Sequence, residues 1–456
     1  MSDSVLPQTE GVPGERVYTP PYPAMSSGHL EKRLLHKVLV AVNAPTDWPG
    51  WLIGSVALVP IAGVAGLWWL LIGDRGALFL AVVLAAFILT DALMLVGLRR
   101  WRFSFGPVGP QLFTLEFPRL LTAVLAIPVA VWFGPAPAVI GVVLVNLGAS
   151  LALVWGTFLE PQRLSLSHLT LKDDLWRQGA PPLRLLHITD LHVERFSRRE
   201  AQLVQMVREI APDVILLTGD YLNLSYVDDP IAHAHARRVL TALSSGKENL
   251  VYAVLGSPPV DRSSASLFDG LPIRLLRDEV VTIDLPTPSG SPPTQVTRSQ
   301  GRVVESGQIW RRAQRNQESE TRRLALLGLD CSHSPVRDAA RLAAVVAQAP
   351  SDAFRVLLYH SPELMPVAPN FDVNLYLCGH THGGQVRLPF YGALLTSSEQ
   401  GKRFEMGHYR SQDTHLYVSR GVGLEGLGAP RVRFLCPPEI TLVSIQGPED
   451  RQEENQ

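Results

Sequence analysis

The sequence has little cysteine and almost no net charge. Its 456 residues include three cysteines, Cys331, Cys378 and Cys436, which are widely spaced and form no Cys-x-x-Cys pair. This spacing excludes a cysteine-based zinc knuckle or dithiol redox motif, and a sparse, odd set suits a reducing compartment. The formal net charge is −1, so whole-chain charge gives no reason to expect nucleic acid as a partner.

The first thirty residues lack an apolar run after a basic start, and they contain no twin-arginine pair. We therefore expect no secretory signal. Residues 1–30 carry five prolines and no apolar periodicity, which predicts a disordered segment, and residues 446–456 are predicted to be a disordered tail. Residues 31–40 are basic and amphipathic, and they suit either a helix on the membrane surface or an ordinary solvated helix.

Charged residues are scarce between residues 51 and 160, whereas residues 161–456 have the composition of a soluble protein. Residues 51–73 are an uncharged apolar stretch of 23 residues, which as a helix reaches about 35 Å and crosses a bilayer. Residues 31–160 are therefore predicted to form a membrane domain, in which the third span is short and contains Pro128. The predicted transmembrane helices are 51–73, 77–98, 120–133 and 138–158.

Positive residues cluster on one side of these spans. The opposite-side loops hold only Arg75, which Asp74 balances. The positive-inside rule predicts a multi-pass cell-membrane protein whose N-terminus and soluble domain are both cytoplasmic, and loss of the third span would invert this topology. The clustered residues are Lys32, Arg33, Lys37, Arg99, Arg100, Arg102, Arg163 and Lys172.

One carboxylate, Asp91, falls inside the second predicted span. A charged group in lipid is costly and often functional. Because Asp91 is close to the arginine-rich end of its helix, we expect it to snorkel or to pair with Arg99 or Arg100, rather than to serve in transport or proton relay.

Acidic and histidine side chains follow several apolar strands in the second half of the chain. A predicted strand from Leu183 leads to Asp190 and His192, and strand alternation would send both side chains to the same side. A single strand-end Asp or His is usually a cap, but four such elements in order predict a metal site. The elements are Asp190-Leu-His192, Gly219-Asp220, His360 and Gly379-His380-Thr381-His382.

The order of these blocks resembles the calcineurin-like metallophosphoesterase superfamily. The Gly-His-Thr-His-Gly-Gly-Gln form at 379–385, with segments 416–421 and 434–440, is similar to the membrane-associated bacterial YkuE/YaeI-like subgroup. The resemblance covers residues 183–445. It implies an α/β four-layer metallophosphoesterase domain, with two packed mixed β-sheets flanked by helices. An N-terminal α-helical transmembrane domain would precede it, with residues 161–182 as a linker.

The resemblance also implies two divalent metal ions, Mn, Fe or Zn, among which oxygen and imidazole ligands do not select. Asp220 would serve both ions, and Asp220 and His380 are the predicted catalytic residues. Paired cations activate water for in-line attack on phosphorus and neutralise the developing charge. The first ion would be held by Asp190, His192, Asp220 and His382, and the second by Asp220, His360 and His380.

One block departs from the family pattern. Where the family has Gly-Asn-His, this chain has Gly256-Ser257-Pro258. The Asn normally gives the second metal an oxygen ligand, and the His normally protonates the leaving oxygen. Ser257 is a poorer ligand and Pro258 carries no proton, so we expect a weakened second site and a loss of about 10²- to 10⁴-fold in rate. Asp261 is an alternative source of the missing oxygen ligand.

Residues 286–323 are rich in Pro, Ser, Gln and Arg and interrupt two strands that should be neighbours. They are predicted to be a long surface insertion, either attracted to anionic lipid headgroups or simply solvated. The other histidines of the soluble half match no ligand block, and we interpret them as structural or surface residues. They are His187, His233, His235, His333, His408 and His415.

Two hypotheses of function follow. In the first, the protein is a membrane-anchored, metal-dependent phosphoesterase that hydrolyses a phosphodiester or pyrophosphate of a phosphorylated small molecule or lipid, such as an envelope precursor. In the second, it is a catalytically impaired relative that binds a phosphorylated ligand or a partner, because Ser257 and Pro258 replace the Asn-His pair.

Overall fold

The computed structural model describes the apolar N-terminal helices and most of the C-terminal half of the chain. The described residues are 16–17, 43–176, 181–247, 250–261, 263–285, 322–426 and 429–448. The predictions for the N-terminal segment, for residues 31–40, for nearly all of the insertion and for most of the C-terminal tail lie outside these residues.

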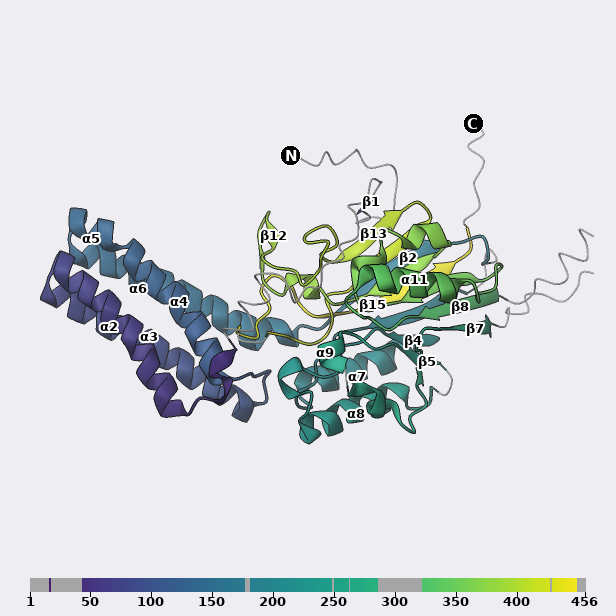
Figure 1. Ribbon diagram of the computed structural model, residues 1–456, viewed down its shortest axis with the longest axis horizontal. Coiled ribbons are helices and arrows are strands. Elements are labelled where there is room, and N and C mark those ends of the chain that lie inside the picture. The colour runs from purple at the N-terminus through teal and green to yellow at the C-terminus, as the bar shows by residue number, and fades with distance from the viewer. Residues whose placement is uncertain are drawn as a thin grey trace, which may run out of the picture.

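Four helices in the first part of the chain are long and apolar enough to cross a membrane, and the third is bent. Figure 1 shows them as a bundle at one end of the molecule. Many large apolar side chains on the bundle surface are exposed, as expected of helices that face lipid. The first, second and fourth of these contain α2 (Gly50–Ile72), α3 (Asp74–Trp101) and α6 (Pro135–Val154), and the third is divided into α4 (Val108–Leu125) and α5 (Ile127–Phe133).

The third span is longer than predicted. It runs over residues 108–133 as α4 and α5, which are separated at Ala126. Pro128 lies in the first turn of α5, and its missing N–H explains the interruption of helical hydrogen bonding. The predicted span began at residue 120, whereas α4 also includes Glu116 and Arg119, charged side chains that the bundle buries.

Asp91 pairs with Arg119 rather than with the arginines at the end of its own helix, so that part of the prediction was wrong. The Asp91 oxygens accept hydrogen bonds of 2.6 and 2.7 Å from the Arg119 guanidinium. Arg119 also donates to the Asn146 side chain of α6 at 3.2 Å. Burial inside the bundle makes this neighbouring-helix pairing more favourable than a solvated contact with Arg99 or Arg100, which are exposed.

The soluble half contains two mixed β-sheets, as predicted. One sheet has the order β1-β13-β14-β10-β9-β8-β7 and the other β2-β15-β3-β4-β5-β6, and β11 and β12 form a separate hairpin. The strands are β1 (Arg16–Val17), β2 (Ser165–Lys172), β3 (Leu183–Ile188), β4 (Val214–Leu217), β5 (Val251–Ala253), β6 (Arg274–Leu275), β7 (Glu279–Leu285), β8 (Arg322–Gly328), β9 (Phe354–Leu358), β10 (Leu375–Cys378), β11 (Arg387–Leu388), β12 (Gly392–Ala393), β13 (Gly407–Ser411), β14 (Thr414–Val418) and β15 (Glu439–Gln446).

The two sheets pack face to face, with helices on their outer faces, and this confirms the four-layer fold. Strand alternation divides neighbouring residues between layers: Leu185 joins the core between the sheets, whereas Leu186 packs under the helices of its own sheet. Val356 and Leu357 divide in the same way on the other sheet. The helices are α7 (Arg198–Ile210) and α8 (Pro230–Ser244) on one side and α11 (Pro335–Val346) on the other, and the short α9 (Pro258–Asp261) lies in a loop.

Part of the segment predicted as a linker is a strand. Residues 165–172 form β2, which pairs with β15 in parallel over its whole length. Its apolar residues Leu169 and Leu171 are buried in the core between the sheets, which explains why it belongs to the domain. The strands β7 and β8 on either side of the insertion are antiparallel partners, so the insertion extends from one hairpin.

The buried pair in the bundle yields a stability prediction. Asp91→Leu leaves the Arg119 charge buried without its partner, and we expect it to lower the free energy of unfolding by about 3–5 kcal/mol. The double variant Asp91→Leu/Arg119→Met removes both charges and is expected to recover most of that loss. The measurement is thermal unfolding of the full chain in detergent.

Arg100→Gln provides the control, because this side chain at the same helix end is exposed and lies outside the contacts between the two domains. It is expected to leave the unfolding midpoint almost unchanged. A fall as large as that of Asp91→Leu would instead support pairing of Asp91 with the helix end.

Candidate metal centre

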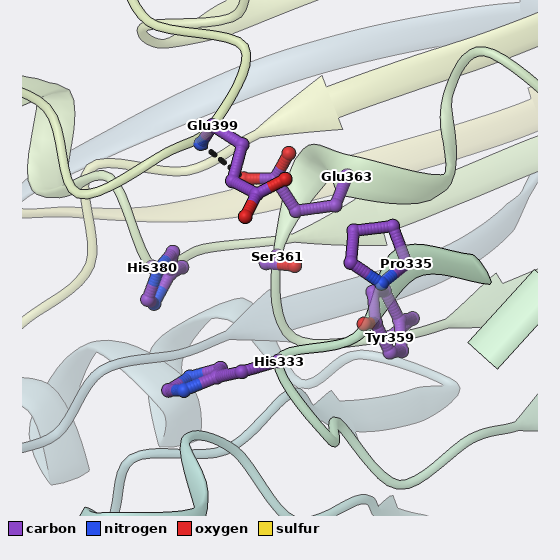
Figure 2. A pocket seen from close by; sticks show the side chains of 7 residues that line it. All are labelled: His333, Pro335, Tyr359, Ser361, Glu363, His380 and Glu399. Atoms are coloured by element: carbon purple, nitrogen blue, oxygen red, sulfur yellow. Dashed lines mark hydrogen bonds between the residues drawn. The ribbon is translucent and has the colours of Figure 1, made fainter. Parts of the chain in front are cut away.

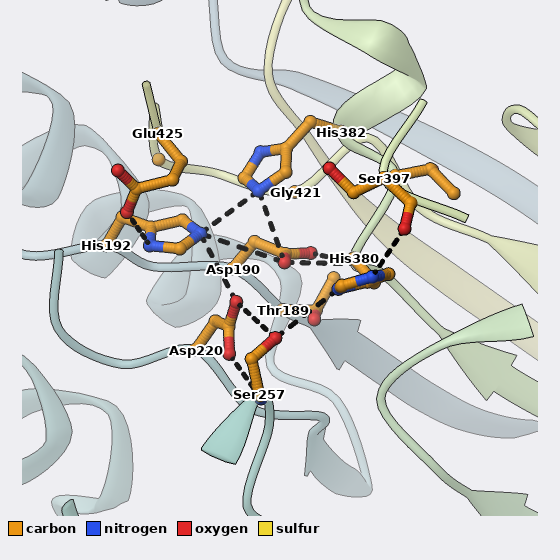
Figure 3. A network of polar contacts seen from close by, with 12 residues as sticks. Thr189, Asp190, His192, Asp220, Ser257, His380, His382, Ser397, Gly421 and Glu425 are labelled. Carbon is orange, nitrogen blue, oxygen red and sulfur yellow. Dashed lines mark hydrogen bonds and ion pairs between the residues drawn. The ribbon is translucent and has the colours of Figure 1, made fainter. Parts of the chain in front are cut away.

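The six predicted ligands meet at one edge of the two sheets, in loops that follow β3, β4, β9 and β10. They form two groups of three in which the potential ligand atoms lie within 4.8 Å of one another, so each group can hold a metal ion. All six side chains are buried, and Figure 3 shows how most of them converge. The groups are Asp190, His192 and His382, and Asp220, His360 and His380.

Loop conformation, rather than strand alternation, brings these side chains together. β3 ends at Ile188, and Asp190 and His192 both adopt left-handed backbone, with φ of 52° and 41°. The interpretation that alternation along a strand aligns them was therefore wrong. Non-glycine residues rarely adopt positive φ, and such strain concentrates at functional sites. The other ligands with positive φ are Asp220, His380 and His382.

Gly219 forms a sharp turn between β4 and Asp220. Its φ is 98°, and a Cβ atom there would collide with the backbone of Gly256. Only glycine permits both the turn and this close approach. The turn places Asp220 directly beside the loop that carries Ser257.

The first group has the chemistry of a cation site. His192 Nε2 and His382 Nε2 are 3.0 Å apart, and Asp190 Oδ1 lies 3.5 Å from His382 Nε2. Nitrogen lone pairs and a carboxylate face one another here, and a cation is what such a donor set accommodates. The residues present therefore fit a divalent metal ion.

The second group adjoins the first through Asp220. Asp220 Oδ2 lies 3.2 Å from His360 Nε2 and 3.7 Å from His192 Nε2. His380 Nδ1 in turn lies 3.2 Å from His360 Nε2. Asp220 is thus within reach of both groups, as expected of a carboxylate that two cations share.

Without metal, two of the four histidines of the centre, His360 and His192, hold their protons strongly. Burial lowers the pKa of His360, but the carboxylates of Asp220 and Asp190 outweigh it and raise that pKa to about 10. Burial also opposes the charge on His192, yet Glu425 and the same two carboxylates raise its pKa to about 9. A metal ion that binds here displaces these protons.

Partners outside the two groups fix the orientation of two imidazoles. His192 Nδ1 lies 3.2 Å from a Glu425 carboxylate oxygen, and His360 Nδ1 donates to the Thr218 carbonyl at 2.8 Å. Each contact leaves Nε2 facing the centre, and such outer partners tune metal ligands. No sequence motif marks Glu425 as a partner of His192, since it lies outside the blocks that contain the ligands.

The replaced block contributes a hydroxyl group to the centre. Ser257 Oγ lies 3.3 Å from Asp220 Oδ2 and 3.4 Å from His380 Nδ1. It therefore faces the second group, as predicted. Pro258 begins the short helix α9 and brings no proton donor.

Asp261 does not supply the missing oxygen ligand, and this alternative was wrong. Its carboxylate is saturated by four hydrogen bonds of 2.7 to 3.1 Å, which tie together the two loops of the centre. Burial and the nearby Asp220 raise the pKa of Asp261 to about 6. The donors are the backbone N–H groups of Asp220, Tyr221 and Gly256 and the hydroxyl of Ser264.

His333 lies beside the centre, although the sequence analysis assigned it a structural or surface role. Its ring centroid is 5.8 Å from that of His380. The two rings border a small cavity of about 10 Å³, shown in Figure 2, which is enough for about one water molecule. No sequence motif marks His333 as a residue that approaches His380. The other lining residues are Pro335, Tyr359, Ser361, Glu363 and Glu399.

The contact between His192 and Glu425 yields a prediction about metal affinity. Glu425→Ala removes the group that orients His192, and we expect it to weaken manganese binding by about 10- to 100-fold. Isothermal titration of the metal-free full chain measures this. Asp352→Asn, which alters an exposed carboxylate, is the control and should bind like the natural protein. Equal affinity in Glu425→Ala would rule out the orienting role.

Comparisons with known proteins agree with this geometry. The family model described as calcineurin-like phosphoesterase matches residues 183–384. The chain is similar to the metallophosphoesterase YkuE of Bacillus subtilis, with 26% identity over 64% of this chain and 89% of that protein. It is also similar to the phosphodiesterase YaeI of Escherichia coli, with 27% identity over 59% of this chain and 84% of that protein.

A third relative is LpxG of Chlamydia trachomatis, a UDP-2,3-diacylglucosamine pyrophosphatase. It is 24% identical over 71% of this chain and 95% of its own length. The matched family segment contains both groups of buried ligands and the strands β3, β4, β9 and β10 that precede them. Residues 183–384 of the chain are therefore a calcineurin-like metallophosphoesterase domain, and the chain is similar to the metallophosphoesterases YkuE, YaeI and LpxG.

Proposed function

We propose that this protein is a membrane-anchored phosphoesterase that hydrolyses a phosphodiester or pyrophosphate. The observation that carries the proposal is the pair of adjoining ligand groups, all buried, with Asp220 in reach of both. A structural role does not explain such a set, because buried carboxylates and imidazoles of this density are costly unless a cation compensates them.

Two divalent ions would complete the centre, drawn from Mn, Fe or Zn. When bound, such ions supply activation of water and neutralisation of charge on the phosphoryl oxygens. The chain's own residues would hold and orient these ions. Asp220 lies within reach of both groups. His380 directs Nδ1 toward the second group, and its Nε2 lies 3.2 Å from the Ser397 carbonyl oxygen. The first ion would rest on Asp190, His192, Asp220 and His382, and the second on Asp220, His360 and His380.

A lipid-linked substrate suits the surroundings of the centre. The β11–β12 hairpin and the residues after it expose several large apolar side chains, and Ser397 at its end contacts His380. Lys402 Nζ lies 3.4 Å from the centroid of the Tyr391 ring, a pairing of aromatic and cation that suits a bilayer interface. The relative LpxG acts, by its name, on a diacylated pyrophosphate. The exposed residues are Leu388, Phe390, Tyr391, Leu394 and Leu395.

We infer a membrane topology, which the four apolar helices and the distribution of charge support. With four spans, the arginines after α3 and the basic residues after α6 fall on the same side of the bilayer. The positive-inside rule places that side, and the phosphoesterase domain, in the cytoplasm. The centre would then act on substrates at the inner face of the cell membrane.

Hydrolysis of a chromogenic phosphodiester by the full chain in detergent, with added manganese, tests the activity. We expect turnover by the natural protein and none by Asp190→Ala, which removes a ligand of the first group. Thermal unfolding of both proteins without metal checks that the variant is folded. A folded, metal-loaded natural protein with no turnover on this or related esters would contradict the proposal.

The second candidate, an impaired relative that binds rather than hydrolyses, rests on the replaced block. Ser257→Asn/Pro258→His restores an oxygen ligand and a proton donor, and we expect turnover to rise by about 10²- to 10⁴-fold because a general acid contributes that much. Steady-state kinetics at saturating manganese measure the change. No gain over an already active natural protein would show that the block does not limit catalysis.

A further inference from the structure

A large cationic cavity lies where the membrane bundle meets the phosphoesterase domain, apart from the metal centre. Its volume is about 530 Å³, which is in the range of small-molecule sites, about 300–1,000 Å³. One wall is the end of α3, and the other is formed by the loop before α7 and by α8 (Figure 1). The lining residues are Arg99, Arg102, Arg195, Phe196, His235 and Arg238.

The charge of this cavity is poorly compensated. Four of the six lining residues are arginines, and none is acidic. Arg195 pairs with Asp229 at 2.7 Å. Within the described part of the chain, no carboxylate forms a salt bridge with Arg99, Arg102 or Arg238.

An aromatic ring holds two of these cations near each other. The guanidinium carbons of Arg99 and Arg195 lie 5.6 and 5.7 Å from the centroid of the Phe105 ring. One arginine belongs to the membrane bundle and the other to the phosphoesterase domain. Cation–π contacts reduce the cost of this clustering, but the remaining positive charge favours an anion between the two domains.

His235 adds a hydrogen-bond donor rather than an acceptor. Its Nδ1 accepts a 2.6 Å hydrogen bond from the Phe196 N–H, so the neutral ring carries its hydrogen on Nε2. Burial and the charges of Arg195 and Arg238 lower the pKa of His235. Guanidinium groups and an imidazole N–H are donors that suit phosphate oxygens.

The walls of the cavity are fixed to one another by buried polar contacts. The Phe105 N–H and the Ser104 hydroxyl, both in the loop between α3 and α4, donate to Glu194 at 2.9 and 2.8 Å. Arg431 pairs with the same Glu194 carboxylate and donates to Ser225 at 2.8 Å. The cavity is therefore preorganised, which lowers the entropic cost of binding a ligand.

Its position relative to the bundle identifies the source of the anion. Arg99 lies in the last turn of α3 and Arg102 directly follows that helix. A residue at the end of a membrane-spanning helix lies at the level of the lipid headgroups. Phosphate diesters of anionic lipids are the commonest anions at that level on the cytoplasmic face.

We propose that this cavity binds a phosphate group, supplied by the headgroup of an anionic lipid. The bound headgroup would bridge arginines of the two domains and hold the phosphoesterase domain against the bilayer. This inference does not depend on hydrolysis at the metal centre, which is formed by other residues.

The test titrates the full chain in neutral detergent with phosphatidylglycerol, with phosphatidylcholine and, separately, with inorganic phosphate. We expect phosphatidylglycerol to raise the thermal unfolding midpoint by several degrees in a saturable way, because a ligand that binds only the folded state stabilises it. Phosphatidylcholine should have no such effect. In Arg99→Gln/Arg238→Gln, the half-saturating phosphatidylglycerol concentration is expected to rise at least tenfold.

Two matched variants separate a built site from diffuse attraction. Arg100→Gln/Arg208→Gln removes the same charge from exposed arginines outside the cavity and should bind like the natural protein. Arg99→Lys/Arg238→Lys keeps the charge and should restore most of the binding if the glutamine variant is folded. Retained lipid, counted by native mass spectrometry, gives a second readout.

The outcomes are distinct. The site would be overturned if both glutamine double variants lost phosphatidylglycerol binding equally. It would also be overturned if neither phosphatidylglycerol nor inorganic phosphate raised the unfolding midpoint in a saturable way. A saturable response to inorganic phosphate alone would overturn the lipid source while leaving a phosphate site.

Discussion

The carboxylate of Asp220 is the point on which this structure depends. It is buried between two groups of imidazole and carboxylate ligands and lies 3.7 Å from His192 and 3.2 Å from His360. Both sheets contribute loops to these groups, so the face-to-face packing of the sheets and the geometry of the centre stabilise each other. The Asp220 and Gly256 N–H groups donate hydrogen bonds to Asp261. These bonds help to hold the Asp220 loop in its strained, positive-φ conformation, and metal binding would compensate the cost of that strain.

The membrane bundle is joined to the phosphoesterase domain by buried polar contacts as well as by the chain. The loop after α3 reaches Glu194, two residues beyond His192. Beyond α6, Glu160 accepts a hydrogen bond from the Cys436 N–H, and Cys436 Sγ donates to the His382 carbonyl at 3.2 Å. Loops that carry two proposed ligands are thus fixed to the bundle. If the bundle spans a membrane as we propose, these contacts would hold the centre in a fixed orientation close to the bilayer.

Sequence could predict the fold and the ligand set, because short blocks after apolar strands are local signals. It could not predict what depends on contacts distant in the chain. Asp91 and Arg119 are 28 residues apart and meet only through helix packing. Glu425 reaches His192 across more than two hundred residues, and His333 approaches His380 through loop geometry. Asp261 is close in sequence to the replaced block, but the alternative that it supplies a metal ligand was wrong. The backbone N–H groups that bind its carboxylate cannot be identified from the sequence.

We propose that two cations share the Asp220 carboxylate. The most direct test is metal-specific anomalous scattering from crystals of the full chain that have been soaked in manganese. We expect two separate peaks, one beside His192 and His382 and one beside His360 and His380, on either side of Asp220. Failure of the second peak to appear at saturating manganese would contradict a two-metal centre, and the absence of both peaks would contradict the proposed ligands altogether.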